Sequence, residues 1–168
     1  MGEIFHVCRS AGREFTQEEW FEYCNQRRNN PEKAIRTTIG KYTFNDNDVC
    51  LNPEVITLKV DDKRTYGYEV SLKWCYCGNG LWQYGIDYNT GDGGGGFSPS
   101  FASPDEKREW LRGYPSEREC KLAACEAAKN RLYNSYHKGD PKVKRLWEMV
   151  DEYQKTISRP KIVQLELF

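Results

Sequence analysis

Hydrophobic and polar residues alternate along two neighbouring stretches in the middle of the chain. Between Tyr66 and Tyr76 the even-numbered positions are aromatic or aliphatic, and most odd-numbered positions are polar. The same alternation returns between Trp82 and Tyr88. Successive side chains of a strand point to opposite faces, so this pattern predicts two strands with one apolar face. The glycine–asparagine–glycine of residues 78–80 suits a tight turn, and we therefore expect an antiparallel hairpin whose apolar face is covered by helices.

Two further stretches extend this hairpin into a sheet. Residues 54–60 alternate, with Ile56, Leu58 and Val60 on one face, and predict a strand before the hairpin. Residues 97–101 predict a short edge strand, where a proline is tolerated. The sequence therefore predicts an antiparallel three- to four-stranded meander over residues 54–101.

Capping signals predict a helical N-terminal part over residues 14–40. Thr16 precedes Glu19 by three positions, which is the spacing of a capping box and marks a helix start. The helix should end near residues 29–31, where two asparagines precede a proline. Pro31 then predicts a second short helix that runs through Ile39.

Three helices are expected over residues 103–158. Ser103 and Glu106 have the capping-box spacing, and so do Ser116 and Glu119; the second of these helices should reach about residue 136. Asp140 followed by a proline predicts the start of the last helix. The predicted fold class is α+β, with the meander packed against about four helices in a single domain over residues 1–160 and a tail over residues 161–168.

Composition narrows the environment in which the protein works. The 168 residues suffice for one domain with a core, and the formal net charge is zero, so no strong overall field attracts the chain to nucleic acid. Its seven cysteines are an odd number, and no segment has the pattern of a signal peptide or of a membrane span. We therefore expect reduced thiols, a cytoplasmic location and no membrane partner.

A run of four glycines, Gly93, Gly94, Gly95 and Gly96, is the one compositionally biased segment. Backbone N–H groups of such a run can approach a phosphate closely, but the lysine and hydroxyl residue that complete a P-loop are missing. We predict a mobile hairpin tip at this position.

Metal and catalytic signals are weak. Residues 45–48 resemble the start of a calcium loop but lack its glycine and closing glutamate. Cys75 and Cys77 share a strand face, yet this spacing differs from the usual zinc knuckle. The two histidines, His6 and His137, lie in no recognisable motif. We expect no catalytic residues, no cofactor and no metal, and a small metal-dependent enzyme is the third functional alternative.

The order of strands followed by a helix, over residues 55–135, resembles the arm-binding domains of phage-type integrases. That resemblance implies DNA contacts from the sheet, where this chain offers Lys63, Arg64 and Lys73. Phosphate contacts supply much of the affinity for nucleic acid, and three cations are few. The second functional alternative is therefore a DNA-binding module or an anti-defence (anti-CRISPR-like) protein that acts on a host nuclease through the sheet and the glycine run.

The last five residues carry the most specific motif. Gln164, Leu165, Leu167 and Phe168, with one residue between the leucines, match Gln-Leu-x-Leu-Phe. This resembles the peptide by which bacterial polymerases and repair proteins are tethered to the replicative sliding clamp. The resemblance implies that the leucines and the phenylalanine fill apolar pockets of the clamp while the amide binds at their rim.

The leading functional hypothesis is therefore a non-enzymatic accessory or inhibitor protein of a phage or mobile element, with the bacterial sliding clamp as its partner. The competing interpretation of the same residues is a final edge strand that packs on the protein's own core.

Overall fold

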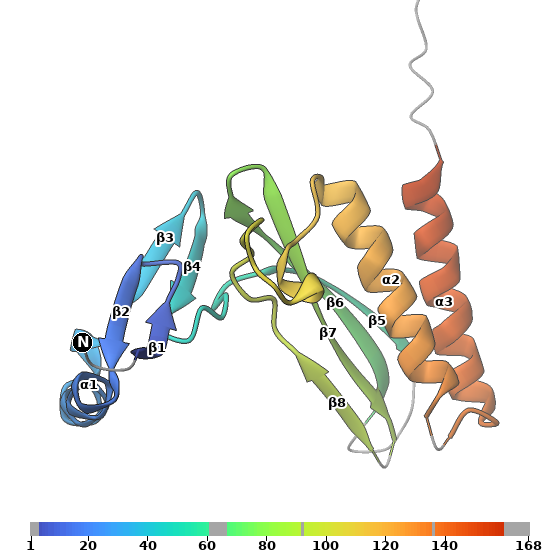
Figure 1. Ribbon diagram of the computed structural model, residues 1–168. Coiled ribbons are helices and arrows are strands. Elements are labelled where there is room, and N and C mark those ends of the chain that lie inside the picture. Colours follow the sequence, from blue (N-terminus) through green and yellow to red (C-terminus); the bar gives the residue numbers. More distant parts are fainter. Residues whose placement is uncertain (1–3, 61–66, 92, 136, 160–168) are drawn as a thin grey trace, which may run out of the picture.

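The central hairpin forms as its alternation predicts. The computed structural model describes residues 4–60, 67–91, 93–135 and 137–159 (Figure 1). Within them, β6 (Tyr68–Gly78) and β7 (Leu81–Thr90) pair antiparallel, with Trp74 opposite Tyr84. The turn between them has positive φ angles of 86°, 53° and 74° at its three residues, which glycine and asparagine tolerate. Tyr66 lies outside the described residues.

The hairpin belongs to a four-stranded antiparallel meander in the order β5-β6-β7-β8, which confirms the predicted α+β class. β5 is Glu54–Val60, as expected. β8 is Gly94–Phe97, so the predicted edge strand over residues 97–101 was misplaced. The prediction of a hairpin tip was also wrong for Gly94, Gly95 and Gly96, because these glycines form the strand itself.

Close approach to β7 explains why β8 is built from glycine. A Cβ on Gly94 would overlap the carbonyl oxygen of Tyr88, and a Cβ on Gly96 would overlap that of Ile86. Residues with side chains cannot occupy these two positions without displacing the backbone. The glycine run is therefore a packing requirement of this edge of the sheet.

Two helices cover one face of the sheet (Figure 1). They are α2 (Glu117–Tyr133) and α3 (Pro141–Ser158), which begin at the predicted caps Ser116 and Asp140. α2 ends three residues before Tyr136, which lies outside the described residues. The main core between sheet and helices includes Val70, Leu72, Ile86, Ala124, Leu132, Leu146 and Val150.

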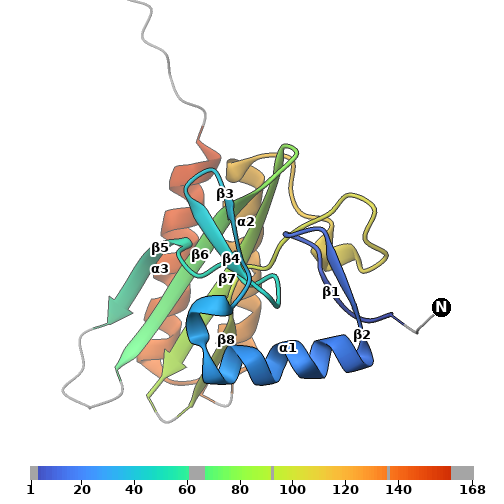
Figure 2. The same cartoon turned by 90° about the vertical axis from the view of Figure 1, so that its left-hand side faces the viewer.

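The opposite face of the sheet is covered in part as well. A hairpin of β3 (Arg36–Ile39) and β4 (Tyr42–Asn45) lies over β6 (Figure 2). Cys75 and Cys77 are buried beneath it in a second apolar cluster with Phe44. The prediction of a mostly polar second face was therefore wrong at this end of β6.

The described residues hold three α-helices, where about four were predicted, and two predicted helical segments form other structure. Residues 31–39 form a short 3-10 helix, η1 (Pro31–Lys33), followed by β3, whose β-branched residues favour a strand. Residues 103–113 contain only the 3-10 helix η2 (Glu109–Leu111). The Glu106 carboxylate pairs with Arg9 and Arg108 instead of returning to Ser103, so the expected capping box does not form.

The N-terminal hairpin, β1 (Ile4–Cys8) and β2 (Arg13–Thr16), leads into α1 (Gln17–Asn29), and both hydrogen bonds of the predicted capping box are present. Two buried carboxylates join these elements to the rest of the fold. Asp46 accepts a hydrogen bond from the Tyr23 hydroxyl (3.1 Å) and pairs with Arg27. Asp48 accepts the backbone N–H groups of Arg9 (3.0 Å) and Ser10 (2.9 Å). The acidic turn that resembled a calcium loop therefore serves as an internal joint.

Candidate functional site

The residues singled out from the sequence do not form one basic surface in the described part of the chain. Lys63 and Arg64 lie outside the described residues. Lys73 pairs with Asp87 on the neighbouring strand, and its side chain is only 16% exposed. The Asp87 carboxylate also occupies the space beside Gly96. An anion at the glycines would therefore meet a carboxylate, which opposes the phosphate interpretation.

The C-terminal peptide is a candidate site of a different kind. Gln164, Leu165, Leu167 and Phe168 lie outside the described residues. The last described residues, Ser158 and Arg159, are exposed at the end of α3.

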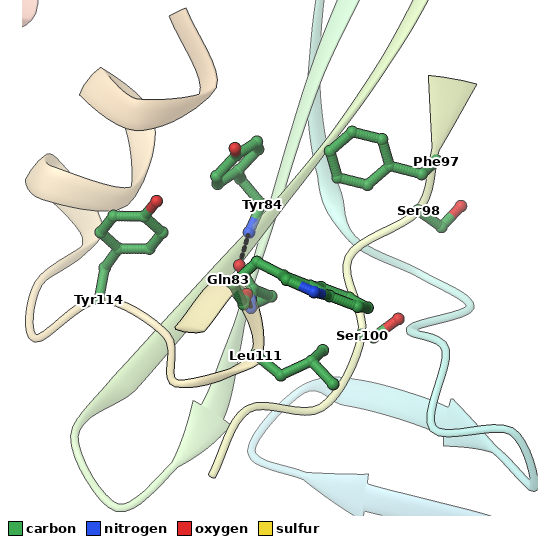
Figure 3. Close-up of a pocket in the computed structure, with 8 residues that line it drawn as sticks. Gln83, Tyr84, Phe97, Ser98, Ser100, Leu111 and Tyr114 are labelled. Carbon is green, nitrogen blue, oxygen red and sulfur yellow. Dashed lines mark hydrogen bonds between the residues drawn. The ribbon is translucent and has the colours of Figure 1, made fainter. Parts of the chain in front are cut away.

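An apolar hollow lies where the edge of β7 lacks a partner strand. β8 pairs with β7 only from Ile86 onward, and Trp82 pairs instead with Tyr114 through two N–H···O bonds of 2.8 Å. Between these two pairings, the backbone N–H of Tyr84 donates to the side-chain oxygen of Gln83 (3.1 Å; Figure 3). Neither pairing covers β7 at Tyr84, and this uncovered part of its edge leaves room for a pocket.

Gln83 fixes one wall of this pocket. Its side chain is 4% exposed, and its amide nitrogen donates to the backbone carbonyl of Trp110 at 2.7 Å. This bond ties η2 to the sheet edge across 27 positions of sequence. A buried amide with both ends bonded holds its surroundings in one arrangement.

The pocket has a volume of about 440 Å³, and half of its lining residues are aromatic. Its lining residues are Gln83, Tyr84, Phe97, Ser98, Ser100, Trp110, Leu111 and Tyr114. The Tyr84 ring lies between those of Phe97 and Tyr114, with centroid distances of 5.7 and 5.8 Å (Figure 3). This size and this lining are typical of sites that bind an apolar ligand group.

The pocket rings carry no charge at neutral pH. Burial raises the pKa of the Tyr84 hydroxyl, and burial together with the neighbouring Tyr84 raises the pKa of Tyr114 to about 12. Both phenols therefore stay protonated and can donate a hydrogen bond. Trp110 is 66% exposed at the pocket, with the Arg108 guanidinium 5.4 Å from its ring centre.

The thiols of Cys75 and Cys77 and the imidazole of His6 contact other side chains of the fold. Cys75 and Cys77 are buried with their sulfur atoms 4.0 Å apart, and the hydrogen bond that the Cys75 thiol donates to Cys50 raises the pKa of Cys75. His6 stacks on Trp20 with ring centres 3.5 Å apart. No group of three or more metal-ligating side chains converges within the described residues.

Comparison of the chain with protein-family models, with curated proteins and with solved structures finds no match. None of the helices in the described ranges is long and apolar enough to cross a membrane.

The sequence pattern did not identify the pocket residues as a site. The helix predicted to start at Ser103 would include Trp110, and Gln83 lies inside the alternating stretch from Trp82 to Tyr88, so neither position indicates a pocket. The available signal was a tryptophan among charged residues just before Gly113.

Proposed function

We propose that this protein is a non-enzymatic binding protein that docks on the bacterial replicative sliding clamp through its C-terminal peptide. The observation that carries the proposal is the residue order Gln164-Leu165-Glu166-Leu167-Phe168. Two leucines and a terminal phenylalanine supply the apolar anchors that dominate small interfaces. A peptide of this size supports a dissociation constant on the order of micromolar.

The end of α3 supports this role for the tail. The Arg118 guanidinium binds the carbonyl oxygens of Ile157 (3.1 Å) and Ser158 (2.9 Å), so the last turn of the helix is held in place. Ser158 and Arg159 are exposed. A chain that reaches the surface at a fixed helix end can present the following residues to a partner.

Removing residues 164–168 tests the proposal. We expect the shortened chain to lose co-purification with a bacterial sliding clamp and to keep the thermal midpoint of the full chain. Glu166→Ala is the matched control, because this position is variable in the motif and should leave binding intact. A sharp fall in the midpoint would show that the peptide is a strand of the protein's own fold, and clamp binding by the shortened chain would also refute the proposal.

The second proposal, a DNA-binding or anti-defence protein that acts on a host nuclease through the sheet, has less support. Lys73, the one of its three proposed cations that lies in the described residues, is paired with Asp87. The glycines of β8 are required by the close approach of β8 to β7. An origin in a phage or mobile element stays a prediction.

A further inference from the structure

We propose that the open edge of β8 and the aromatic pocket beside it form a second binding site, which takes an extended partner peptide carrying an aromatic side chain and, two residues away, an acidic one. This site uses none of residues 164–168.

The backbone of β8 offers the first part of this site. β8 is the last strand in the sheet order, and all four of its residues are exposed. Alternate residues of an edge strand direct their N–H and C=O groups away from the sheet, where an added strand can bind them. Gly94, Gly95 and Gly96 carry no side chains, so a peptide backbone can approach this edge without steric obstruction.

The aromatic pocket offers the second part. Phe97 ends β8 and also lines the pocket, so the open edge and the pocket are continuous. Phe97 is 43% exposed and Trp110 is 66% exposed. Two large rings left in solvent beside an uncharged hollow indicate a surface that a partner covers. A hollow of about 440 Å³ accommodates one aromatic side chain of that partner.

Arg131 determines the charge of the expected peptide. A smaller hollow of about 160 Å³ lies on β8 itself, lined by Gly95, Gly96, Phe97 and the Arg131 side chain of α2. Ile86 and Tyr88 also line it, so it lies on the sheet face opposite to the Asp87 carboxylate, because neighbouring side chains of a strand point to opposite faces. Arg131 is exposed and has no ion pair with any other residue in the described ranges. A carboxylate on the partner would complete a charge-assisted bond with this guanidinium.

The spacing of the two groups follows from strand geometry. Phe97 lines both hollows, so they are neighbours along β8. Side chains on one face of an added strand recur every second residue. An acidic residue and an aromatic residue two positions apart would therefore reach the two hollows together.

Two labelled peptides serve as probes, Ser-Thr-Glu-Thr-Phe-Thr-Ser and Ser-Thr-Phe-Thr-Glu-Thr-Ser, because a strand can add in either direction. We expect one of them to give saturable fluorescence anisotropy with the full chain below about 1 mM. In amide NMR spectra, saturation should shift the resonances of Gly94–Phe97. The single amino acid N-acetylphenylalanine amide should bind at least about tenfold more weakly, which separates a peptide site from a site for a free aromatic molecule.

Exposed positions allow variants that leave the core intact. Trp110→Ser and Arg131→Gln should each weaken the binding of the peptide by about tenfold. The matched controls are Tyr133→Ser, at an aromatic ring of α2 that is 67% exposed, and Arg28→Gln on α1. Both controls should bind as the unchanged protein does.

Three results would overturn the proposal: no saturation by either probe, equal binding by the pocket variants and the controls, or amide shifts that leave β8 unaffected. Tighter binding of N-acetylphenylalanine amide than of either peptide would indicate a site for a small aromatic molecule and would also contradict the proposal. None of these four results bears on the clamp, because residues 164–168 remain present throughout.

Discussion

The carboxylate of Asp87 occupies the space that a side chain on Gly96 would require. The same carboxylate pairs with Lys73 across the sheet. One acidic residue thus contacts both the glycine edge of β8 and a lysine of β6.

Gly96→Ala should destabilise the protein, because its Cβ would overlap the Ile86 carbonyl and the Asp87 carboxylate. We expect a loss of about 2 kcal/mol in the free energy of unfolding, or a fall of roughly 4–8 °C in the thermal midpoint. Gly93→Ala is the matched control, since an added Cβ there meets no atom within 4 Å. Circular dichroism during heating measures both variants. Equal midpoints for the two would contradict the assignment of β8.

Asp46→Ala should detach α1 from the rest of the fold. Asp46 is 3% exposed and is the acceptor for Tyr23 and Arg27. Removing it leaves both donors without this partner. Water can reach the Arg27 side chain, which is 33% exposed, so we expect the free energy of unfolding to fall by only about 2–3 kcal/mol. Urea unfolding measures the change against the exposed control Asp105→Ala. A difference below about 0.5 kcal/mol between the unfolding free energies of the two variants would contradict a role of Asp46 in joining α1 to the rest of the fold.

Glu54 should make the stability depend on pH. The ion pair with Lys41 holds the pKa of Glu54 below its ordinary value of 4.5, and the Tyr42 hydroxyl donates to the same carboxylate at 2.9 Å. A carboxyl with a lowered folded-state pKa stabilises the fold above its unfolded pKa and loses that contribution as the pH falls through the folded value. Glu54→Gln should therefore lower the thermal midpoint at pH 7, and the difference should shrink as the pH falls below 4.5 and through the lower folded-state pKa. A difference that is constant from pH 7 to pH 3 would exclude this cause.

Local signals predicted the elements whose stability is local. The alternation of β6 and β7, the capping box at Thr16 and the caps Ser116 and Asp140 each depend on neighbours within four residues or on one repeating pattern. The structure confirms all of these elements.

Distant contacts decided the elements that were wrong. Ser103 had the correct spacing for a helix start, but its capping partner Glu106 binds Arg9, which is 97 positions away from it. Glycine has a low strand propensity, yet Gly94 and Gly96 form a strand because β7 lies too close for any other residue. The pocket also depends on a distant contact, the hydrogen bond from Gln83 to the Trp110 carbonyl, which no local sequence pattern indicates.

The most direct test of the proposed function is calorimetric titration of a purified bacterial sliding clamp with the full chain and with the double variant Leu167→Ala, Phe168→Ala. The account predicts saturable heat for the full chain, with a dissociation constant on the order of micromolar, and at least a hundredfold weaker binding for the double variant at an unchanged thermal midpoint. Equal binding by the two proteins, or no binding by the full chain, would contradict it.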